Sequence, residues 1–454
     1  MDENLGDEPK SVNTAEPISS WFLSRLAVAS KPRLSEQEPS SIPGFRFVPR
    51  TGVIYVMHEA MARGFSYDDP HWANLGQGSP ETGPIPDAPP RVENVTIAGP
   101  HQQYAPVAGN KDLCQAVADF YNAVYRRGKK SKYARDNVSI ASGGRLALTR
   151  LASALGNVNM GHFIPDYTAY EELLSVFKAF SAIPILLDAE TGYQIAPAAL
   201  KKEILGRGLS ALLVSNPCNP TGQLVEGEAL SQWCELARDC QCSLILDEFY
   251  SHYIYAGSTD GAAKMVSAAA FVEDVETDPI IIVDGVTKNW RYPGWRISWT
   301  LGPKAVIEAI ASAGSFLDGG ANHPFQGVAA GLLKPELARQ ETLAIQKHFG
   351  KKRRYMLERL KDMSIGVDAE PAGAFYIWAN LSGLPEPLND GMNFFREGLK
   401  ESVIIVPGVF FDVNPGNRRH HGRYENYCRI SFGPELKRLE TGLDSLARVI
   451  ARLK

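Results

Sequence analysis

Residues 211–222 read ALLVSNPCNPTG, an aliphatic run that changes abruptly into a turn with two Asn-Pro pairs. The aliphatic run is typical of a strand buried on both faces, and the Asn-Pro turn closed by Gly222 ends it. In an open α/β sheet, ligands bind beyond the carboxyl ends of the strands. The stretch therefore predicts a buried strand whose following turn, which contains Asn219, borders a ligand site.

Four further apolar runs between about residues 110 and 300 are also followed at once by polar, Gly or Pro residues. Helical periodicity separates them, which predicts a mostly parallel sheet covered by helices. We therefore expect an α/β protein with a three-layer αβα large domain, whose strand ends converge on one cleft. The five stretches are NVSIASGGR (137–145), HFIPDY (162–167), ALLVSNPCNPTG (211–222), SLILDEFY (243–250) and IIIVDGVTK (280–288).

The overall composition excludes several classes of protein. The chain has 454 residues and a formal net charge of −4, with 44% hydrophobic and 22% charged residues. These values are typical of a globular protein and predict neither nucleic-acid binding nor a membrane span. The acidic first residues lack the apolar core of a signal peptide, so we expect a cytoplasmic location. The spacing of the six cysteines fits no zinc or thioredoxin pattern, which predicts free thiols and no metal site.

Lys288 and Asp247 each follow a buried strand of the predicted sheet. A lysine held in a partly dry cleft can lose its proton and attack a carbonyl carbon, although most loop lysines are simply solvated. A carboxylate directly after an apolar run is either a helix cap or the partner of a buried cation. Pyridoxal phosphate enzymes pair their ring nitrogen with such an Asp, and Tyr250 could reach the same ring through its hydroxyl.

The SGGR segment, residues 142–145, lies between a predicted strand and a helical pattern. Gly143 and Gly144 let backbone N–H groups approach an anion at a helix N-terminus, although glycine pairs are also common in tight turns. If that anion is a phosphate group, the guanidinium of Arg296 would donate further hydrogen bonds to it; otherwise Arg296 would form a structural salt bridge. Tyr167 follows another strand, where its ring would stack on a cofactor or pack in the core.

Two further polar residues are candidates for the site: Asn219 lies in the turn after a predicted strand, and Arg429 lies inside another. Asn219 can donate a hydrogen bond to a phenolate oxygen. Arg429 lies in the alternating apolar segment YCRISFG, residues 427–433. An arginine among apolar strand neighbours is usually either paired or available for a carboxylate. We therefore expect Arg429 to bind the carboxylate of a substrate.

From about Asn74 to the C-terminus, the chain resembles the class I/II aminotransferases, which are fold-type I pyridoxal phosphate enzymes. The segments NPCNPTG, DEFY and RISFG, and a lysine with an arginine eight residues later, stand in the family's order. Together these motifs are specific, whereas each alone is weak evidence. The resemblance implies three parts: an N-terminal arm with part of the small domain (1–72), a large cofactor-binding domain (73–330) and a C-terminal small domain (331–454), the small domain being α+β.

The resemblance also implies roles for single residues. Lys288 would form a Schiff base with pyridoxal 5′-phosphate and move the proton at the α-carbon of the substrate, while Asp247 would pair with the pyridine nitrogen. Asn219 and Tyr250 correspond to the groups on the cofactor's 3′ oxygen. Tyr167 corresponds to the ring that stacks on the cofactor. The residues that bind the cofactor's phosphate group correspond to Gly143, Gly144, Thr287 and Arg296. Arg429 corresponds to the residue that binds the substrate carboxylate.

The resemblance further implies a homodimer with shared active sites. Tyr104, in QYAPVAG, corresponds to a tyrosine that reaches the phosphate group bound in the neighbouring subunit. Gly78, in NLGQG, corresponds to the loop that covers the substrate. If both assignments hold, each subunit supplies one residue to its partner's site and binds its own substrate beneath Gly78.

The chain departs from the family's pattern at three places. Many members have a serine where this chain has Gly285, so one phosphate contact is missing. The stretch 318–330, which corresponds to the region shaping the substrate side-chain pocket, offers Asn322 and His323 but no arginine. This composition argues against a dedicated clamp for a dicarboxylate. The basic insertion at residues 413–426 either borders the cleft or forms a solvated loop, and the loop is favoured.

The predicted function is the transfer of an amino group between an L-amino acid and a 2-oxo acid. The same lysine, aspartate and arginine would also serve a pyridoxal phosphate-dependent lyase, cyclase or C–C bond-forming enzyme acting on an amino acid. That class of enzyme stays the alternative at this stage, because the first chemical steps are shared. The sequence does not identify the amino donor.

Overall fold

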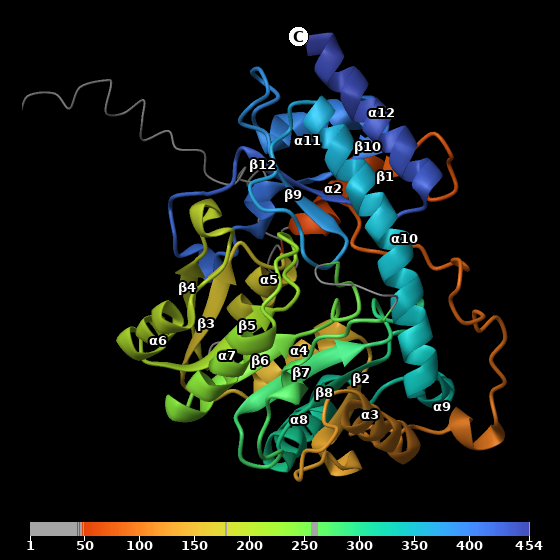
Figure 1. Ribbon diagram of the computed structural model, residues 1–454, viewed down its shortest axis with the longest axis vertical. Coiled ribbons are helices and arrows are strands. Elements are labelled where there is room, and N and C mark those ends of the chain that lie inside the picture. The colour runs from red at the N-terminus through yellow and green to blue at the C-terminus, as the bar shows by residue number, and fades with distance from the viewer. Residues whose placement is uncertain are drawn as a thin grey trace, which may run out of the picture.

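The computed structural model describes residues 43, 45, 48, 50–177, 179–255 and 262–453. Most of the predicted N-terminal arm lies outside these residues. One seven-stranded sheet and two smaller sheets, together with the helices packed on them, make up the described chain (Figure 1). The predicted α/β fold, with a large mostly parallel sheet and a smaller α+β part, is confirmed.

The large sheet has the strand order β2-β8-β7-β6-β5-β3-β4. Strand β8 runs antiparallel to both its neighbours, and the remaining pairs are parallel. All five predicted strands are present, whereas β4 and β8 were not predicted. The bounds are β2 Val138–Ala141, β3 Asn159–Ile164, β4 Ser181–Leu186, β5 Leu209–Ser215, β6 Ser243–Asp247, β7 Ile280–Gly285 and β8 Ser298–Leu301.

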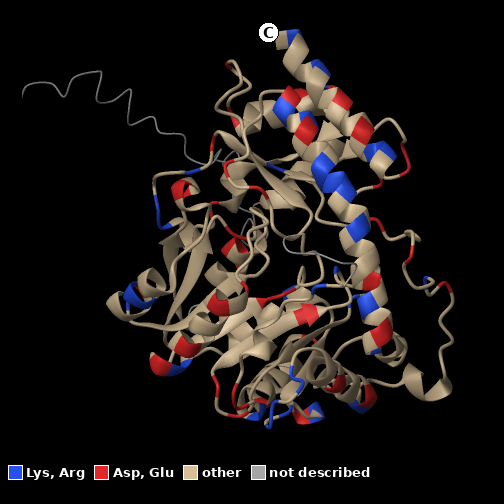
Figure 2. Ribbon diagram, viewed as in Figure 1, with Lys and Arg blue, Asp and Glu red and all other residues tan. Residues whose placement is uncertain are grey.

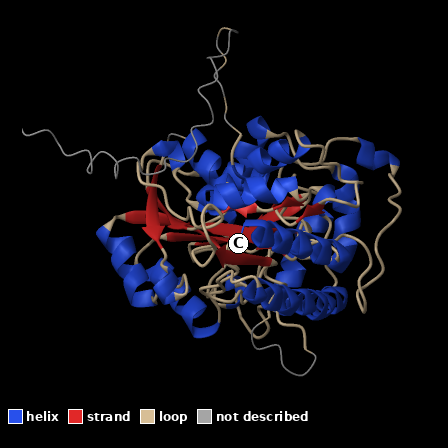
Figure 3. Ribbon diagram, turned by 90° about the horizontal axis from the view of Figure 1, so that it is seen from above, coloured by secondary structure: helices blue, strands red, loops and turns tan. Residues whose placement is uncertain are grey.

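Helices cover both faces of the large sheet (Figure 3). Helix α7 illustrates why they pack there: Leu230, Trp233, Cys234 and Ala237 are spaced along one face of the helix and are all buried. The three-layer arrangement follows from amphipathic helices burying their apolar faces on a fully apolar sheet. The helices are α3 Lys111–Val124, α4 Gly144–Ala154, α5 Ala169–Val176, α6 Pro197–Gly206, α7 Gly227–Asp239, α8 Lys304–Leu317 and α9 His323–Leu332.

The smaller part combines segments from near both ends of the described chain. Strand β12 pairs antiparallel with β11 and β9, and β1 pairs in parallel with β10. The helix α12 lays a buried face of Leu439, Leu443, Leu446 and Ile450 on this part. The strands are β1 Ala73–Asn74, β9 Tyr376–Asn380, β10 Val403–Ile404, β11 Val406–Pro407 and β12 Tyr427–Ser431. The helices are α2 Gly52–Met61, α10 Pro335–Asp362, α11 Gly391–Lys400 and α12 Leu436–Leu453.

Short 3-10 helices and loops complete the described chain. Lys, Arg, Asp and Glu are interspersed over its outer helices and loops (Figure 2). No helix among the described residues is long and apolar enough to cross a membrane. All six cysteines are free thiols, as predicted. The 3-10 helices are η1 Gly99–Gln102, η2 Arg135–Asn137, η3 Ala189–Thr191, η4 Ala268–Ala270, η5 Pro293–Trp295, η6 Gly408–Phe411 and η7 Pro415–Asn417.

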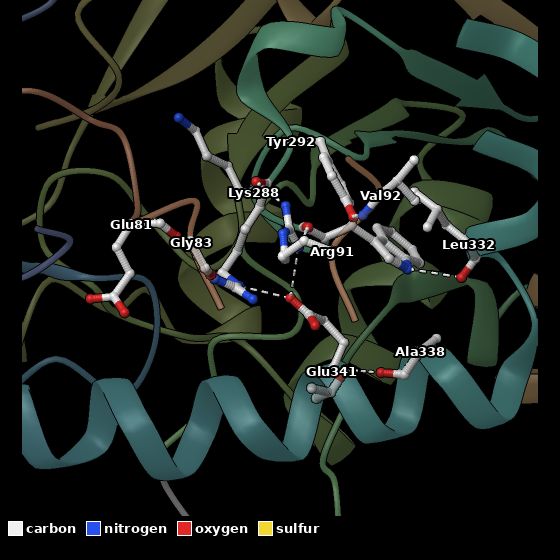
Figure 4. Close-up of polar contacts among 12 residues, drawn as sticks. Glu81, Gly83, Arg91, Val92, Lys288, Tyr292, Leu332, Ala338 and Glu341 are labelled. Carbon is white, nitrogen blue, oxygen red and sulfur yellow. Dashed lines mark hydrogen bonds and ion pairs between the residues drawn. The ribbon is translucent and has the colours of Figure 1, made fainter. Parts of the chain in front are cut away.

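The long helix α10 runs from the large sheet to the small one (Figure 1) and carries a buried ion-pair network. Nε of Arg291 lies 2.7 Å from Oε1 of Glu341, and Nη1 of Arg91 lies 3.7 Å from the same oxygen. Arg91 and Glu341 point toward one another in Figure 4. Arg291 also donates to the carbonyl oxygens of Glu81 and Gly83, at 3.1 and 2.6 Å. The network therefore joins α10 to the loop after Lys288 and to the segment that contains Gly78.

We expect Glu341→Gln to lower the free energy of unfolding by about 3–5 kcal/mol, because it leaves the fully buried Arg291 without its counter-charge. Urea denaturation followed by circular dichroism measures the change. Glu358→Gln is the matched control, because Glu358 is exposed on the same helix. Equal losses for the two variants would contradict a stabilising role for the network.

Candidate active site

A cavity of about 900 Å³ lies at the carboxyl ends of β5, β6 and β7. The large sheet forms its floor, the small sheet contributes Tyr376 and Arg429, and α2 adds an apolar wall. The strand ends predicted to converge do so here. The predicted site residues that line the cavity are Gly78, Gly144, Tyr167, Asn219, Asp247, Tyr250, Thr287, Lys288, Arg296 and Arg429.

Lys288 follows β7 and extends into the cavity, where its Nζ donates a hydrogen bond to the carbonyl oxygen of Gly78. Its backbone is fixed because the Tyr253 hydroxyl donates to the Lys288 carbonyl oxygen at 3.1 Å. Burial, followed by the charges of Arg429 and Arg296, lowers the pKa of Lys288 to about 7. A lysine with this pKa is largely neutral slightly above pH 7, and only the neutral amine is nucleophilic.

Asp247 ends β6 on the cavity floor. Its Oδ2 accepts a hydrogen bond from the Tyr170 hydroxyl at 2.9 Å, and its Oδ1 accepts one from the Phe249 backbone N–H at 3.5 Å. Burial raises the pKa of Asp247 to about 6, while the hydrogen bonds from Tyr170 and Phe249 act in the opposite direction. A cation bound against this carboxylate would be favoured, because it would compensate a charge that burial disfavours.

The turn before α4 is shaped around Arg296. Gly143 has a φ of 90°, and a Cβ there would lie 1.9 Å from Nη2 of Arg296. Gly143 does not line the cavity itself, but its lack of a side chain lets the guanidinium lie over the helix N-terminus. The Thr287 hydroxyl, which also lines the cavity, is buried without a hydrogen-bond partner among the described residues. Together these groups offer donors and positive charge to an anion.

The serine that the family resemblance would place at Gly285 has no room in this chain. A Cβ at Gly285 would lie 2.6 Å from the Ile297 carbonyl oxygen and 2.7 Å from Cα of Ser298, both on the backbone that leads into β8. Backbone atoms cannot shift away as a flexible side chain would, so only glycine fits beside β8 at this position. The packing of β7 against β8 therefore requires glycine at position 285, where this chain departs from the family's pattern.

Arg429, on β12, is 1% exposed and faces Asn219. Its Nη1 donates to Oδ1 of Asn219 at 2.8 Å, and its Nη2 donates to the Gly76 carbonyl oxygen at 2.5 Å. The Tyr376 ring lies beneath the guanidinium at 4.2 Å. Nε of Arg429 is buried without a partner among the described residues, which is unusual for a buried donor and marks it as available to a ligand.

Several residues of the site were not predicted. Tyr376 is one: its hydroxyl oxygen lies 2.8 Å from that of Tyr250, and a Cβ at Gly78 would lie 2.7 Å from it. Tyr170, which binds Asp247, is another, although it stands three residues after the predicted Tyr167 in the segment PDYTAY. The remaining unpredicted residues include the apolar wall of α2, namely Val53, Ile54, Met57 and Met61.

Other predicted features lie away from the cavity. Tyr104 is 95% exposed and does not line it. Asn322 accepts a hydrogen bond from the backbone N–H of Phe325 as the cap of α9, and Nδ1 of His323 lies 3.0 Å from the Gln103 carbonyl oxygen. No described residue of the insertion 413–426 lines the cavity, because the segment packs beside α5.

A lysine, a carboxylate and arginines meet at the carboxyl edge of this three-layer fold, and the family to which the chain belongs decides which reaction class they serve. The chain belongs to the family described as aminotransferase class I and II, which matches residues 70–446. It is an aminotransferase, and the lyase, cyclase or C–C bond-forming alternative is not favoured.

Proteins similar to this chain in sequence are named as aminotransferases as well. The chain is 25% identical over 386 residues to a probable aspartate/prephenate aminotransferase of Aquifex aeolicus, covering 84% of this chain and 91% of that protein. It is 26% identical to an aspartate/prephenate aminotransferase of Thermus thermophilus, covering 81% and 89%. A solved structure of the Thermus thermophilus aspartate aminotransferase with maleate has the same fold, with a TM-score of 0.71, 23% identity and coverage of 88% and 97%.

We expect Tyr170→Phe to shift the acid limb of the kcat/KM profile to higher pH by about one to two units. The Tyr170 hydroxyl stabilises the ionised form of Asp247, so its removal raises the carboxyl pKa, and the ionised carboxylate then exists only at higher pH. Initial rates with an amino acid between pH 5 and 9 measure the shift. Tyr355→Phe, which removes a hydroxyl on α10 outside the cavity, should leave the limb in place. An unshifted limb in Tyr170→Phe would mean that Asp247 does not govern it.

Proposed function

We propose that this aminotransferase binds pyridoxal 5′-phosphate at Lys288 and exchanges amino groups between an L-amino acid and a 2-oxo acid. The observation that carries the proposal is the position of the Lys288 amine. It lies in one cavity with a single carboxylate among the described residues, Asp247, and with four arginines, Arg50, Arg145, Arg296 and Arg429. When bound, the cofactor supplies an aldehyde carbon and a ring that accepts electrons from the substrate's α-carbon.

Lys288 is the group assigned to hold the aldehyde carbon of the cofactor. Its amine is partly neutral near pH 7, so it can bond to a carbonyl carbon without first losing a proton to another base. The same amine, when neutral, would also take the proton from the α-carbon of the substrate. Asp247 would hold a positive charge on the ring nitrogen, because its burial makes an isolated carboxylate unfavourable.

The other cofactor contacts are proposed from the family resemblance, and most of the residues concerned line the same cavity. Tyr250 and Asn219 are assigned to the 3′ oxygen of the ring, and Tyr167 to stacking on its face. Burial raises the pKa of Tyr250, so its hydroxyl stays protonated and can donate. The phosphate group is assigned to the N-terminus of α4, with Gly143, Gly144, Thr287 and Arg296 around it.

Arg429 is assigned to the substrate carboxylate, with Gly78 above it. The free Nε of Arg429 provides a donor that Asn219 and Gly76 do not use. Relatives are named for aspartate and prephenate, so we propose an L-amino acid and a 2-oxo acid as the substrate pair. The apolar wall of α2 faces the same space and would contact the substrate side chain.

A homodimer with shared active sites completes the proposal. Tyr104 is almost fully exposed, so it would contribute to catalysis only by entering the site of a second copy of the chain. Residues 73–330 would then form the cofactor-binding domain, residues 331–454 the C-terminal small domain, and residues 1–72 the arm with part of that small domain. The cytoplasmic location predicted from the sequence also stays a proposal.

We expect Lys288→Ala to lose transamination by at least about 1,000-fold while keeping its circular dichroism spectrum, because it removes both the nucleophile and the proton carrier. Borohydride reduction of the cofactor-loaded wild type should add the cofactor mass to the peptide that contains Lys288. Lys304→Ala, which alters an exposed lysine at the start of α8, is the control and should match the wild type. Reduction that labels a different lysine would refute the assignment.

We expect Arg429→Gln to raise KM for the amino acid by about 100-fold, because a buried charge-assisted contact to a carboxylate contributes about 2–5 kcal/mol. Steady-state rates with saturating cofactor measure KM and kcat separately. Arg418→Gln is the control, since Arg418 is exposed and lies outside the cavity. If KM were unchanged in Arg429→Gln, the substrate carboxylate would have to bind elsewhere.

A further inference from the structure

Residues 76–83, the cover segment, bring backbone atoms to two charged side chains of the cavity. The Gly76 carbonyl oxygen accepts a hydrogen bond from Nη2 of Arg429, and the Gly78 carbonyl oxygen accepts one from Nζ of Lys288. A backbone that contacts both side chains must itself be held in place. The ion pairs that hold it lie outside the cavity.

We propose that Glu81 and Lys352 are positioning residues for the substrate: their buried ion pair fixes the cover segment and, through it, the guanidinium of Arg429. This inference rests on the proposed function, because it takes Arg429 to bind the substrate carboxylate. Neither Glu81 nor Lys352 lines the cavity, so both act through the backbone and not by contact with a ligand. The inference places a determinant of substrate affinity on α10, which supplies no group to the cavity.

The Glu81 carboxylate lies between two basic side chains of α10. Nζ of Lys352 lies 2.8 Å from its Oε2, and Nε2 of His348 lies 2.8 Å from its Oε1. The side chains of Lys352 and Glu81 are only 2% and 10% exposed. Burial alone would raise the pKa of Glu81, but the contacts with His348 and Lys352 lower it to about 2. The carboxylate is therefore ionised near neutral pH, and its burial requires a cation beside it.

Lys352 also joins the cover segment to the chain that leaves β12. Its Nζ donates hydrogen bonds to the carbonyl oxygens of Gly433 and Pro434, at 3.3 and 2.8 Å. The Gly433 carbonyl oxygen also accepts one from the backbone N–H of Glu81, at 2.9 Å. Because β12 carries Arg429, this one ammonium group connects the two segments whose relative position sets the orientation of the guanidinium.

The cover segment fits closely against its surroundings. A Cβ at Gly433 would lie 2.7 Å from the Ser79 carbonyl oxygen, and one at Gly78 would lie 2.7 Å from the Tyr376 hydroxyl oxygen. Arg291 binds two further carbonyl oxygens of the segment from a second direction. The segment therefore stays attached when the ion pair is removed, but a small shift of its backbone changes its contacts in the cavity.

The competing role for the Glu81–Lys352 pair is stability alone. A pair that only stabilises the fold lowers the free energy of unfolding when it is removed, and leaves the affinity of the folded protein for every ligand unchanged. A pair that positions Arg429 weakens the binding of ligands that have an α-carboxylate. It leaves the affinity for pyridoxal phosphate unchanged, because no cofactor contact is assigned to Arg429.

The test compares Lys352→Met, Glu81→Gln and the double variant with Lys351→Met, a control that alters the exposed lysine beside Lys352 on α10. The cofactor-loaded full chain is titrated with α-methylaspartate and α-methylphenylalanine, followed by absorbance. These ligands have no α-hydrogen, so they bind without turnover. We expect each single variant to weaken both ligands by about 10-fold, and by equal factors, because the two share only the α-carboxylate and the amine. Lys351→Met should match the wild type.

Two further measurements separate positioning from stability. The double variant should weaken the α-methyl ligands no more than the larger single variant does, because all three variants remove the same ion pair. Titration of the cofactor-free protein should give an unchanged dissociation constant for pyridoxal phosphate. In steady-state rates with an amino acid, KM should rise by the same factor as the ligand's dissociation constant, while kcat changes less.

Two results would overturn the inference. Unchanged affinity for both α-methyl ligands, together with a lower free energy of unfolding, would leave the ion pair a stabilising role alone. Equal weakening of pyridoxal phosphate and the α-methyl ligands would indicate a general loss of the cavity. If a single variant does not fold, the double variant carries the test, because it leaves neither charge buried without its partner. A wild-type protein that binds no pyridoxal phosphate would instead refute the proposed function, so the two failures are distinguishable.

Discussion

The excess of positive charge in the cavity is the constraint on which the rest of the site depends. Asp247 is the one carboxylate among the cavity's described residues, whereas Lys288, Arg145, Arg296 and Arg429 all face the same space. Cations that lack counter-charges in a partly buried space are unfavourable, so the cavity favours anionic ligands. Burial, and after it this excess of positive charge, lowers the pKa of Lys288, so under the proposed function an anionic ligand would change the reactivity of the amine.

The fold creates this concentration of charge from its backbone. Parallel strands bring their carboxyl ends to one edge, so Asp247 on β6 and Lys288 after β7 become neighbours without being close in sequence. The antiparallel strand β8 then brings the segment before it, with Arg296, against the turn at Gly143. The buried ion pairs of α10 hold the loop after Lys288 and the Gly78 segment to that helix, and the small sheet contributes Arg429 to the cavity.

Much of the large sheet was predictable because its central strands are continuous aliphatic runs. The two strands that were missed have weaker signals. Strand β4 contains Pro184 and lies at the edge of the sheet, where a proline is tolerated but weakens the pattern. Strand β8 is four residues long and begins two residues after Arg296, so it is too short to give a clear strand pattern. The roles assigned to individual site residues, and the domain boundaries, stay predictions.

The sequence by itself determined the chemical groups and the strands that carry them, because the carboxyl ends of parallel strands lie at one edge of an α/β sheet. It also indicated that Gly285 departs from the family's pattern. Only the tertiary structure decided which side chains meet. The hydrogen bond from Tyr170 to Asp247, the contact of Tyr376 with Tyr250 and the wall of α2 join residues far apart in the chain. Such contacts depend on how elements pack in three dimensions, and the local patterns of helix and strand do not encode them.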